Sequence, residues 1–94
     1  MLHIEWTSPA LRDLRDAGEF ITRNNRNAAD ALAKRIIDAV EHLLEYPMIG
    51  RSGRVLGTRE FVLSGTPFII VYRKKVSAIQ ILRILHHARK WPSG

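Results

Sequence analysis

The sequence predicts an α+β fold with the element order β-α-α-β-β-β, in which a helical hairpin packs on an antiparallel sheet. Apolar residues recur at helical spacing between residues 8 and 45, and after residue 50 they gather in short β-rich runs separated by turns. The chain has 94 residues and no cysteine, so its stability must come from an apolar core without disulfides. We therefore expect residues 1–94 to form a single domain.

The first strand and the first helix are predicted from a change of period near residue 7. Residues His3–Trp6 alternate polar and apolar side chains, as an edge strand does. Ser8 suits the N-cap of a helix and Pro9 its first helical position, and this helix is expected to run to about Thr22. Its apolar stripe comprises Leu11, Leu14, Ala17 or Gly18, and Ile21.

A second helix is predicted after a polar break at residues 24–27. Asn27 can cap it, and Pro47 ends it near Glu45 because the residue before a proline resists the helical conformation. Its apolar stripe comprises Ala29, Leu32, Ile36, Val40 and Leu43. Two amphipathic helices joined by a short polar turn form an antiparallel hairpin, and its apolar seam needs a sheet face to cover it.

Three strands are predicted in the second half of the chain, after a glycine-rich loop at residues 50–57. They are expected at residues 58–63, 68–73 and Ala78–His86, where β-branched and other apolar side chains predominate. Tight turns join these strands, so neighbours must be antiparallel. The helix pair then covers one face of the sheet, and the basic residues of this half are left to the opposite face.

Charge is divided unevenly along the chain. Residues 51–94 carry nine Lys or Arg and a single acid, Glu60, whereas residues 1–50 carry six basic and eight acidic residues. This asymmetry favours a surface that meets a polyanion or an acidic partner. Arginine suits bidentate binding of phosphate or carboxylate, but charges at strand edges also protect a sheet from aggregation. The arginines open to either role are Arg51, Arg54, Arg59, Arg73 and Arg83.

The other polar candidates favour structural or binding roles. Glu60 is expected to form a cross-strand ion pair with a neighbouring arginine. His86 and His87 are adjacent, and neighbours on a strand point to opposite faces, so we expect His86 to be structural or to bind a partner. Two histidines without cysteines or a carboxylate cluster make no ligand set, so no metal and no other cofactor are expected. Trp91 is expected to close over the core or to pack against a partner.

The composition also indicates a compartment. The lack of cysteine suits a reducing environment. Acidic and polar residues interrupt the start of the chain before the apolar region of a signal peptide can form, and no run reaches the roughly 18 apolar residues of a membrane span. We therefore expect a cytoplasmic protein that does not contact a membrane.

Three segments of the sequence carry a resemblance to a known group of proteins. They read Pro-Met-Ile-Gly-Arg at residues 47–51, Ile-Ile-Val-Tyr-Arg at 69–73, and Ile-Leu-Arg-Ile-Leu-His at 81–86, and the last runs on to Lys-Trp-Pro at 90–92. Together with the order of the elements, they resemble the RelE/ParE superfamily of bacterial toxins from type II toxin–antitoxin modules. The resemblance covers nearly the whole chain.

Within that superfamily the sequence resembles ParE more than RelE. RelE-like nucleases carry an arginine where this chain has Ile69, and an isoleucine can neither bind phosphate nor transfer a proton. The ending at residues 82–86 and the two full helices also resemble ParE. This resemblance implies a toxin that inhibits DNA gyrase, arrests bacterial growth and stabilises plasmids. It also implies a cognate antitoxin that neutralises the toxin in a hetero-oligomer.

Two alternatives stay open. A RelE-like member would be a metal-independent, ribosome-dependent mRNA endonuclease, with the ribosome and mRNA as partners. Its catalytic groups would come from Arg83, His86, Arg89 and Lys90. A non-toxic module would have kept antitoxin binding alone. In the ParE-like interpretation no residue is assigned to catalysis, and the residues expected to bind antitoxin or target are Arg51, Arg54, Arg59, Arg73, Arg83, His86 and Trp91.

Overall fold

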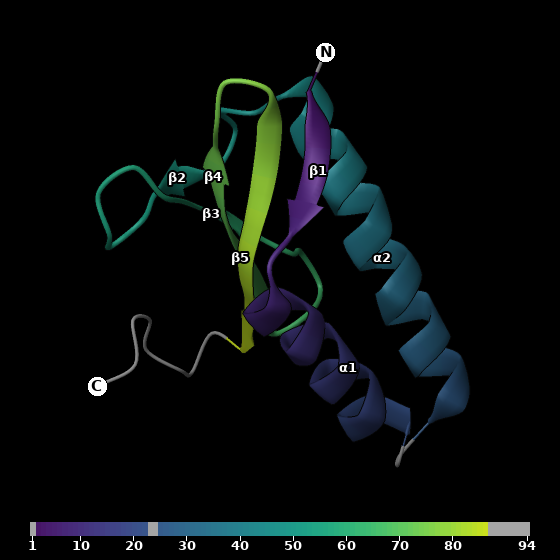
Figure 1. Ribbon diagram of the computed structural model, residues 1–94. Helices are drawn as coiled ribbons and strands as arrows, with labels where there is room; N and C mark the ends of the chain where they lie inside the picture. The colour runs from purple at the N-terminus through teal and green to yellow at the C-terminus, as the bar shows by residue number, and fades with distance from the viewer. Residues whose placement is uncertain (1, 23–24, 87–94) are drawn as a thin grey trace.

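Two helices lie against one face of a five-stranded sheet, as Figure 1 shows. The computed structural model describes residues 2–22 and 25–86, and the predicted Arg89, Lys90 and Trp91 contacts therefore lie outside the described residues. The elements are β1 (His3–Trp6), α1 (Ser8–Thr22), α2 (Arg26–Glu45), β2 (Arg51–Ser52), β3 (Arg59–Val62), β4 (Phe68–Lys74) and β5 (Ala78–His86). Neither α1 nor α2, the two helices within that range, is long and apolar enough to cross a membrane.

The strands are ordered β1-β5-β4-β3-β2 across the sheet. The pairs β2–β3, β3–β4 and β4–β5 are antiparallel, and β1 lies at one edge, as predicted. β1 runs parallel to β5, with Trp6 level with Ile81, because the whole helical hairpin separates it from the other strands instead of a tight turn. The predicted fold class is confirmed, and the sheet adds a parallel edge and the two-residue strand β2 inside the expected loop.

The core lies between the helix pair and the sheet. α2 buries its predicted stripe in full, comprising Ala29, Leu32, Ile36, Val40 and Leu43. In α1 the prediction for Leu11 was wrong, because this side chain is 47% exposed and Ala10 is buried in its place. The small side chains of Ala10 and Ala17 let α1 approach β5 closely. The side chain of Ile21 lies outside the described part of the chain.

Both helices begin at caps other than the predicted ones. Thr7 accepts a hydrogen bond from the main-chain N–H three residues on (3.3 Å), and Ser8 is already helical. Asn25 caps α2 in the same way (3.2 Å), and Asn27 lies inside that helix. Each cap was misplaced because neighbouring residues offer the same oxygen chemistry, so the type of residue does not choose between them. The predicted end of α2 at Glu45 is confirmed.

The helices cover one face of the sheet. Ile70 and Tyr72 on β4 are fully buried against the helices. Because side chains alternate along a strand, Ile69 and Arg73 point to the other side. Cross-strand partners share a face, so the register extends this assignment to the neighbouring strands. The face opposite the helices, called the open face below, carries Arg51, Glu60, Val62, Ile69, Val71, Arg73, Gln80, Arg83 and Leu85. Val71 and Leu85 are nevertheless buried there, at 1% and 6% exposure.

Candidate partner-binding surface

β5 changes its register where β1 ends. Val71 on β4 is level with Arg83, whereas the next residue, Tyr72, is level with Ile81, so Leu82 is an extra residue in β5. β1 pairs with β5 no further than Ile81. Past that point the polar main-chain groups along this edge of β5 need partners other than a strand.

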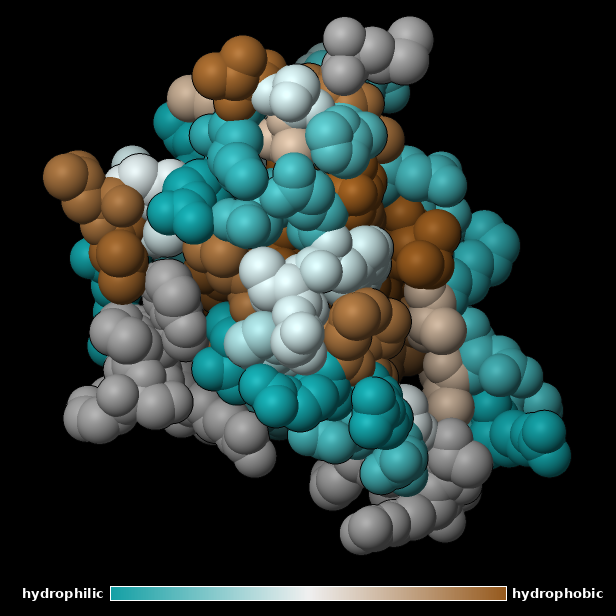
Figure 2. Space-filling model, viewed as in Figure 1, coloured by the Kyte–Doolittle hydropathy of each residue, from teal (hydrophilic) through white to brown (hydrophobic). Residues whose placement is uncertain are grey.

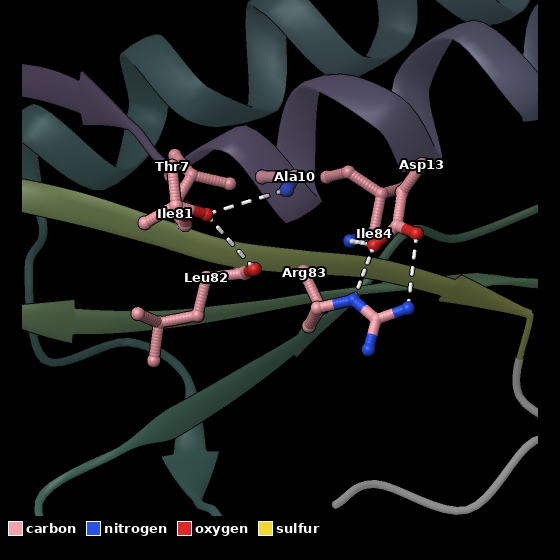
Figure 3. A network of polar contacts seen from close by, with 7 residues as sticks. All are labelled: Thr7, Ala10, Asp13, Ile81, Leu82, Arg83 and Ile84. Atoms are coloured by element: carbon pink, nitrogen blue, oxygen red, sulfur yellow. Dashed lines mark hydrogen bonds and ion pairs between the residues drawn. The ribbon is translucent and has the colours of Figure 1, made fainter. Parts of the chain in front are cut away.

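Thr7 and Asp13 supply those partners, as Figure 3 shows. The Thr7 hydroxyl lies 2.9 Å from the carbonyl oxygen of Ile81 and 3.1 Å from that of Leu82. The main-chain N–H of Ile84 donates to Asp13 Oδ2 at 2.9 Å. Two side chains at the start of α1 therefore continue the hydrogen bonding that β1 leaves unfinished, and they fix α1 to β5.

The same carboxylate holds Arg83. Arg83 Nε donates to Asp13 Oδ2 at 2.6 Å and Nη2 donates to Oδ1 at 3.0 Å, a bidentate pair. The two side chains are only 23% and 11% exposed. The hydrogen bond to Asp13 raises the pKa of the Arg83 guanidinium above its usual value. This arginine is a candidate in both functional interpretations, and its charge is balanced by an acid from the first half of the chain.

Two of the other candidate arginines also have partners within the molecule. Arg51 pairs with Glu60 across β2 and β3 at 3.1 Å, which confirms the predicted cross-strand ion pair of Glu60. Arg59 donates to the carbonyl oxygens of Gly50 (2.7 Å) and Met48 (3.2 Å). Arg51 keeps an exposed guanidinium on the open face, whereas Arg59 is committed to holding the turn after α2.

Tyr72 holds that turn from inside the molecule. Its hydroxyl donates to the carbonyl oxygen of Pro47 (2.8 Å) and accepts from the N–H of Gly50 (2.9 Å). A Cβ at Gly50 would lie 2.8 Å from the Tyr72 ring and hydroxyl, so only glycine fits. Burial raises the pKa of the Tyr72 hydroxyl above its usual 10.0. Two of the segments that carry the family resemblance, residues 47–51 and 69–73, are therefore in direct contact.

Arg54 and Arg73 are less constrained. Neither forms an ion pair with a carboxylate among residues 2–22 and 25–86. Arg73 donates to Gln80 Oε1 at 2.8 Å, across β4 and β5 on the open face, and Arg54 is exposed in the loop between β2 and β3. The unpaired positive charge of the candidate set is therefore concentrated beside β2, β3 and the end of β4.

His42 and His86 each pack against an aromatic side chain. His86 is exposed at the end of β5, and its ring meets the ring of Phe68 edge-on at 5.9 Å. His42 packs against Tyr46 and Phe61 at the end of α2. His87 lies beyond the described residues. Within the described ranges, no group of three or more His, Cys, Asp or Glu side chains could hold a metal ion.

Sequence reasoning missed Thr7, Asp13 and Tyr72. Asp13 and Tyr72 act on segments 20 or more residues away, across contacts that no local pattern reports. For Thr7 a signal was present, since threonine is a favoured helix cap, but the serine after it carries the same signal.

The chain is similar to known proteins over nearly its whole length. Residues 4–91 match a family model described as the ParE toxin of the type II toxin–antitoxin system parDE. A candidate toxin of Sinorhizobium fredii, Y4kP, is 43% identical over 89 residues, covering 95% of this chain and 92% of that protein. Toxin RelE2 of Caulobacter vibrioides is 35% identical over 89 residues, covering 95% and 99%.

Two solved structures share the fold. A chain of the chromosomal ParDE toxin–antitoxin system from P. aeruginosa superposes with a TM-score of 0.81 at 29% identity, covering 92% of this chain and 96% of that one. A chain of the E. coli DinJ–YafQ complex superposes with a TM-score of 0.59 at 14% identity, covering 94% and 96%, and indicates the fold alone.

Proposed function

This chain belongs to the ParE toxin family and is a type II toxin of a ParDE-like toxin–antitoxin system, and we propose that it acts by inhibiting DNA gyrase. The match of the ParE family model to residues 4–91 carries this proposal. Gyrase inhibition is the activity that the ParE resemblance implies, and it requires binding to a protein but no catalytic group on the toxin. Such a toxin acts in the bacterial cytoplasm.

The state of Arg83 supports a binding function over RNA cleavage. A metal-free nuclease needs a cation free to meet the charge that develops on phosphate. Arg83 directs Nε and Nη2 at Asp13, and Ile69, which is level with Leu85 on the open face, offers no charge. Arg83, the arginine proposed for the nuclease interpretation, is thus already paired with a carboxylate.

We also propose that a cognate antitoxin neutralises the toxin by covering the open face. This face combines exposed apolar area at Val62, which is 50% exposed, with the guanidinium groups of Arg51 and Arg73. An acidic segment of the antitoxin would bury the apolar area and balance the charge at the same time. The resulting complex is a toxin–antitoxin hetero-oligomer.

Purified protein tests the proposed target. We expect inhibition of gyrase supercoiling at near-stoichiometric concentrations, with no cleavage of mRNA on ribosomes. The second candidate function, an mRNA endonuclease, is favoured by the relative named RelE2, which covers 95% of this chain. Codon-phased cleavage that requires ribosomes, without gyrase inhibition, would overturn the proposal. If the protein has neither activity and its expression leaves growth unchanged, it is an antitoxin-binding module without toxicity.

A further inference from the structure

The loop between β2 and β3 projects from the molecule and has an apolar tip. It is the projection on the left of Figure 1, and hydrophobic atoms gather at the same place in Figure 2. Leu56 is 97% exposed and the adjacent Val55 is 39% exposed. Adjacent exposed aliphatic side chains form an apolar patch of the kind that binds a protein partner, provided that the backbone carrying them is ordered.

That backbone is held by hydrogen bonds within the loop. Gly53 N–H donates to the Thr58 carbonyl oxygen (2.8 Å), and Thr58 donates to the Val55 carbonyl oxygen from its N–H (3.1 Å) and from its hydroxyl (2.6 Å). Thr58 is the buried polar residue of the described core, at 5% exposure. Gly57 adopts a φ of +84°, which glycine alone adopts readily. The loop is therefore ordered before it meets a partner, and little conformational entropy is lost on binding.

Two arginines lie near the base of this loop. Arg54 belongs to the loop, and Arg73 follows the β4 residue that is level with Arg59, which places it beside Thr58. These are the two candidate arginines that form no ion pair with a carboxylate in the described ranges. An apolar tip with a basic collar is complementary to an apolar pocket with an acidic rim.

Exposure alone does not make such a site, as Val76 illustrates. Val76 is also 97% exposed, in the turn between β4 and β5. Its neighbour Lys75 is bound to Glu5 at 3.2 Å, and no second large hydrophobic residue of that turn is exposed. Lys74, at the end of β4, forms no ion pair with a carboxylate of the described residues, so positive charge lies near this turn as well. Val76 therefore serves as a matched control for Leu56, with the same exposure but without a second exposed aliphatic side chain beside it.

We propose that residues 53–58 form the target-docking loop, which inserts Leu56 into an acidic-rimmed apolar pocket on the folded protein that the toxin inactivates. This inference rests on the proposed function and deepens it. A convex, ordered projection fits a concave pocket of a folded protein, whereas a helical or extended antitoxin segment needs a groove or a sheet face. Target and antitoxin thus contact two adjoining surfaces, the loop and the open face, which meet at Arg73.

The experiment compares Leu56→Glu with Val76→Glu in the full chain. Three measurements are made for each protein: growth arrest on induction in bacteria, inhibition of purified gyrase, and affinity for the cognate antitoxin. We expect Leu56→Glu to weaken growth arrest and gyrase inhibition by about 30-fold or more, the effect of an interface hot spot. Antitoxin affinity and thermal unfolding should stay as in the unmodified protein, and Val76→Glu should match it throughout.

Each contrary result has a separate meaning. Full potency of Leu56→Glu, or an equal loss in Val76→Glu, overturns the target-docking loop while gyrase inhibition by the unmodified protein still stands. An equal loss of antitoxin affinity overturns it in favour of the antitoxin as occupant. If the unmodified protein arrests growth without inhibiting gyrase, the proposed target is wrong, and the growth arrest of Leu56→Glu alone then decides the loop. If the unmodified protein arrests no growth, both proposals are overturned.

The contribution of the two arginines near the loop is tested separately. Arg54→Glu combined with Arg73→Glu should weaken gyrase inhibition by tenfold or more at low salt and by less at high salt, since exposed charges are screened. An effect independent of salt would contradict an acidic rim around the pocket. Leu56→Ala, which adds no charge, should fall between the unmodified protein and Leu56→Glu.

Discussion

Asp13 on α1 forms a bidentate ion pair with Arg83 on β5, and the same carboxylate accepts the main-chain N–H of Ile84. One side chain therefore serves both as a counter-ion and as a substitute for the strand that ends at Trp6. The ion pair joins a residue of the acidic half of the chain to a residue of the basic half. The net charge of residues 51–94 therefore overstates the positive charge that is available to a partner.

Replacing Asp13 should destabilise the fold more than replacing its partner. Asp13→Ala leaves the half-buried Arg83 guanidinium and the Ile84 N–H without their acceptor, and the free energy of unfolding should fall by about 2–3 kcal/mol. Arg83→Ala leaves Asp13 bonded to Ile84 and should cost about 1 kcal/mol. Urea unfolding measures both values.

The exposed pair of Lys34 and Asp38 is the control for this prediction. It spans one helical turn at 2.9 Å, with both side chains more than half exposed. Lys34→Ala should leave the midpoint of urea unfolding almost unchanged, because the charges of an exposed pair are screened by solvent. An Asp13→Ala protein as stable as Lys34→Ala would show that the contact with β5 contributes nothing to stability.

Tyr72→Phe should lower stability and alter its dependence on alkaline pH. The change removes the donor to Pro47 and the acceptor of Gly50, so the free energy of unfolding should fall by about 1–3 kcal/mol at neutral pH. Because burial raises the pKa of Tyr72 in the folded state, the unfolded chain loses this proton first as the pH rises. The contribution of Tyr72 is thus complete below about pH 10 and is lost as the pH climbs through the folded-state pKa.

Unfolding curves between pH 8 and 11 measure that difference, with Tyr46→Phe as control because Tyr46 is 52% exposed. The unmodified protein and Tyr46→Phe should lose stability more steeply above pH 10 than Tyr72→Phe does. Parallel curves for all three proteins would contradict the role assigned to the buried hydroxyl.

Much of the fold could be predicted because it depends on local periodicity. The stripe of α2, its end before Pro47 and the limits of β5 each follow from residues next to one another in the sequence. The parallel pairing of β1 could not be predicted in this way. It depends on where the chain returns after the helical hairpin, and strand patterns carry no information about a distant neighbour.

The candidate site was predictable only as far as residue types allow. Arginine-rich strands indicated a basic surface, and Glu60 could be given an ion pair because it is the single acid among the arginines of residues 51–94. Which arginines remain available was not predictable. Arg83 is neutralised from a helix 70 residues away, whereas Arg73 meets an uncharged Gln80, and both lie in similar strand sequences.

Two glycine substitutions should shift stability in opposite directions. Gly18 lies inside α1, and a Cβ there would meet no heavy atom within 4 Å, so Gly18→Ala should stabilise the protein by about 0.5–1 kcal/mol through helix propensity. Gly50→Ala would press on Tyr72 and on the Glu60 carbonyl oxygen, which lies 3.0 Å from the added atom, and should destabilise by about 2 kcal/mol or more. Thermal unfolding of both variants checks the sign, and a stabilising Gly50→Ala would contradict the packing described for that turn.

The target-docking loop can be tested without touching its tip. A Cβ on Gly53 would lie 2.3 Å from the Thr58 hydroxyl oxygen, so Gly53→Ala must break the hydrogen bonds that close the loop while Leu56 and Arg54 stay in the sequence. Because the loop lies at the edge of the sheet, global stability should fall by no more than about 1–2 kcal/mol. Growth arrest should weaken by tenfold or more, since an opened loop must be ordered again on binding. Ser77→Ala in the turn between β4 and β5 adds no atom and should leave toxicity unchanged. Undiminished toxicity of Gly53→Ala would mean that the ordered shape of the loop is not what the target recognises.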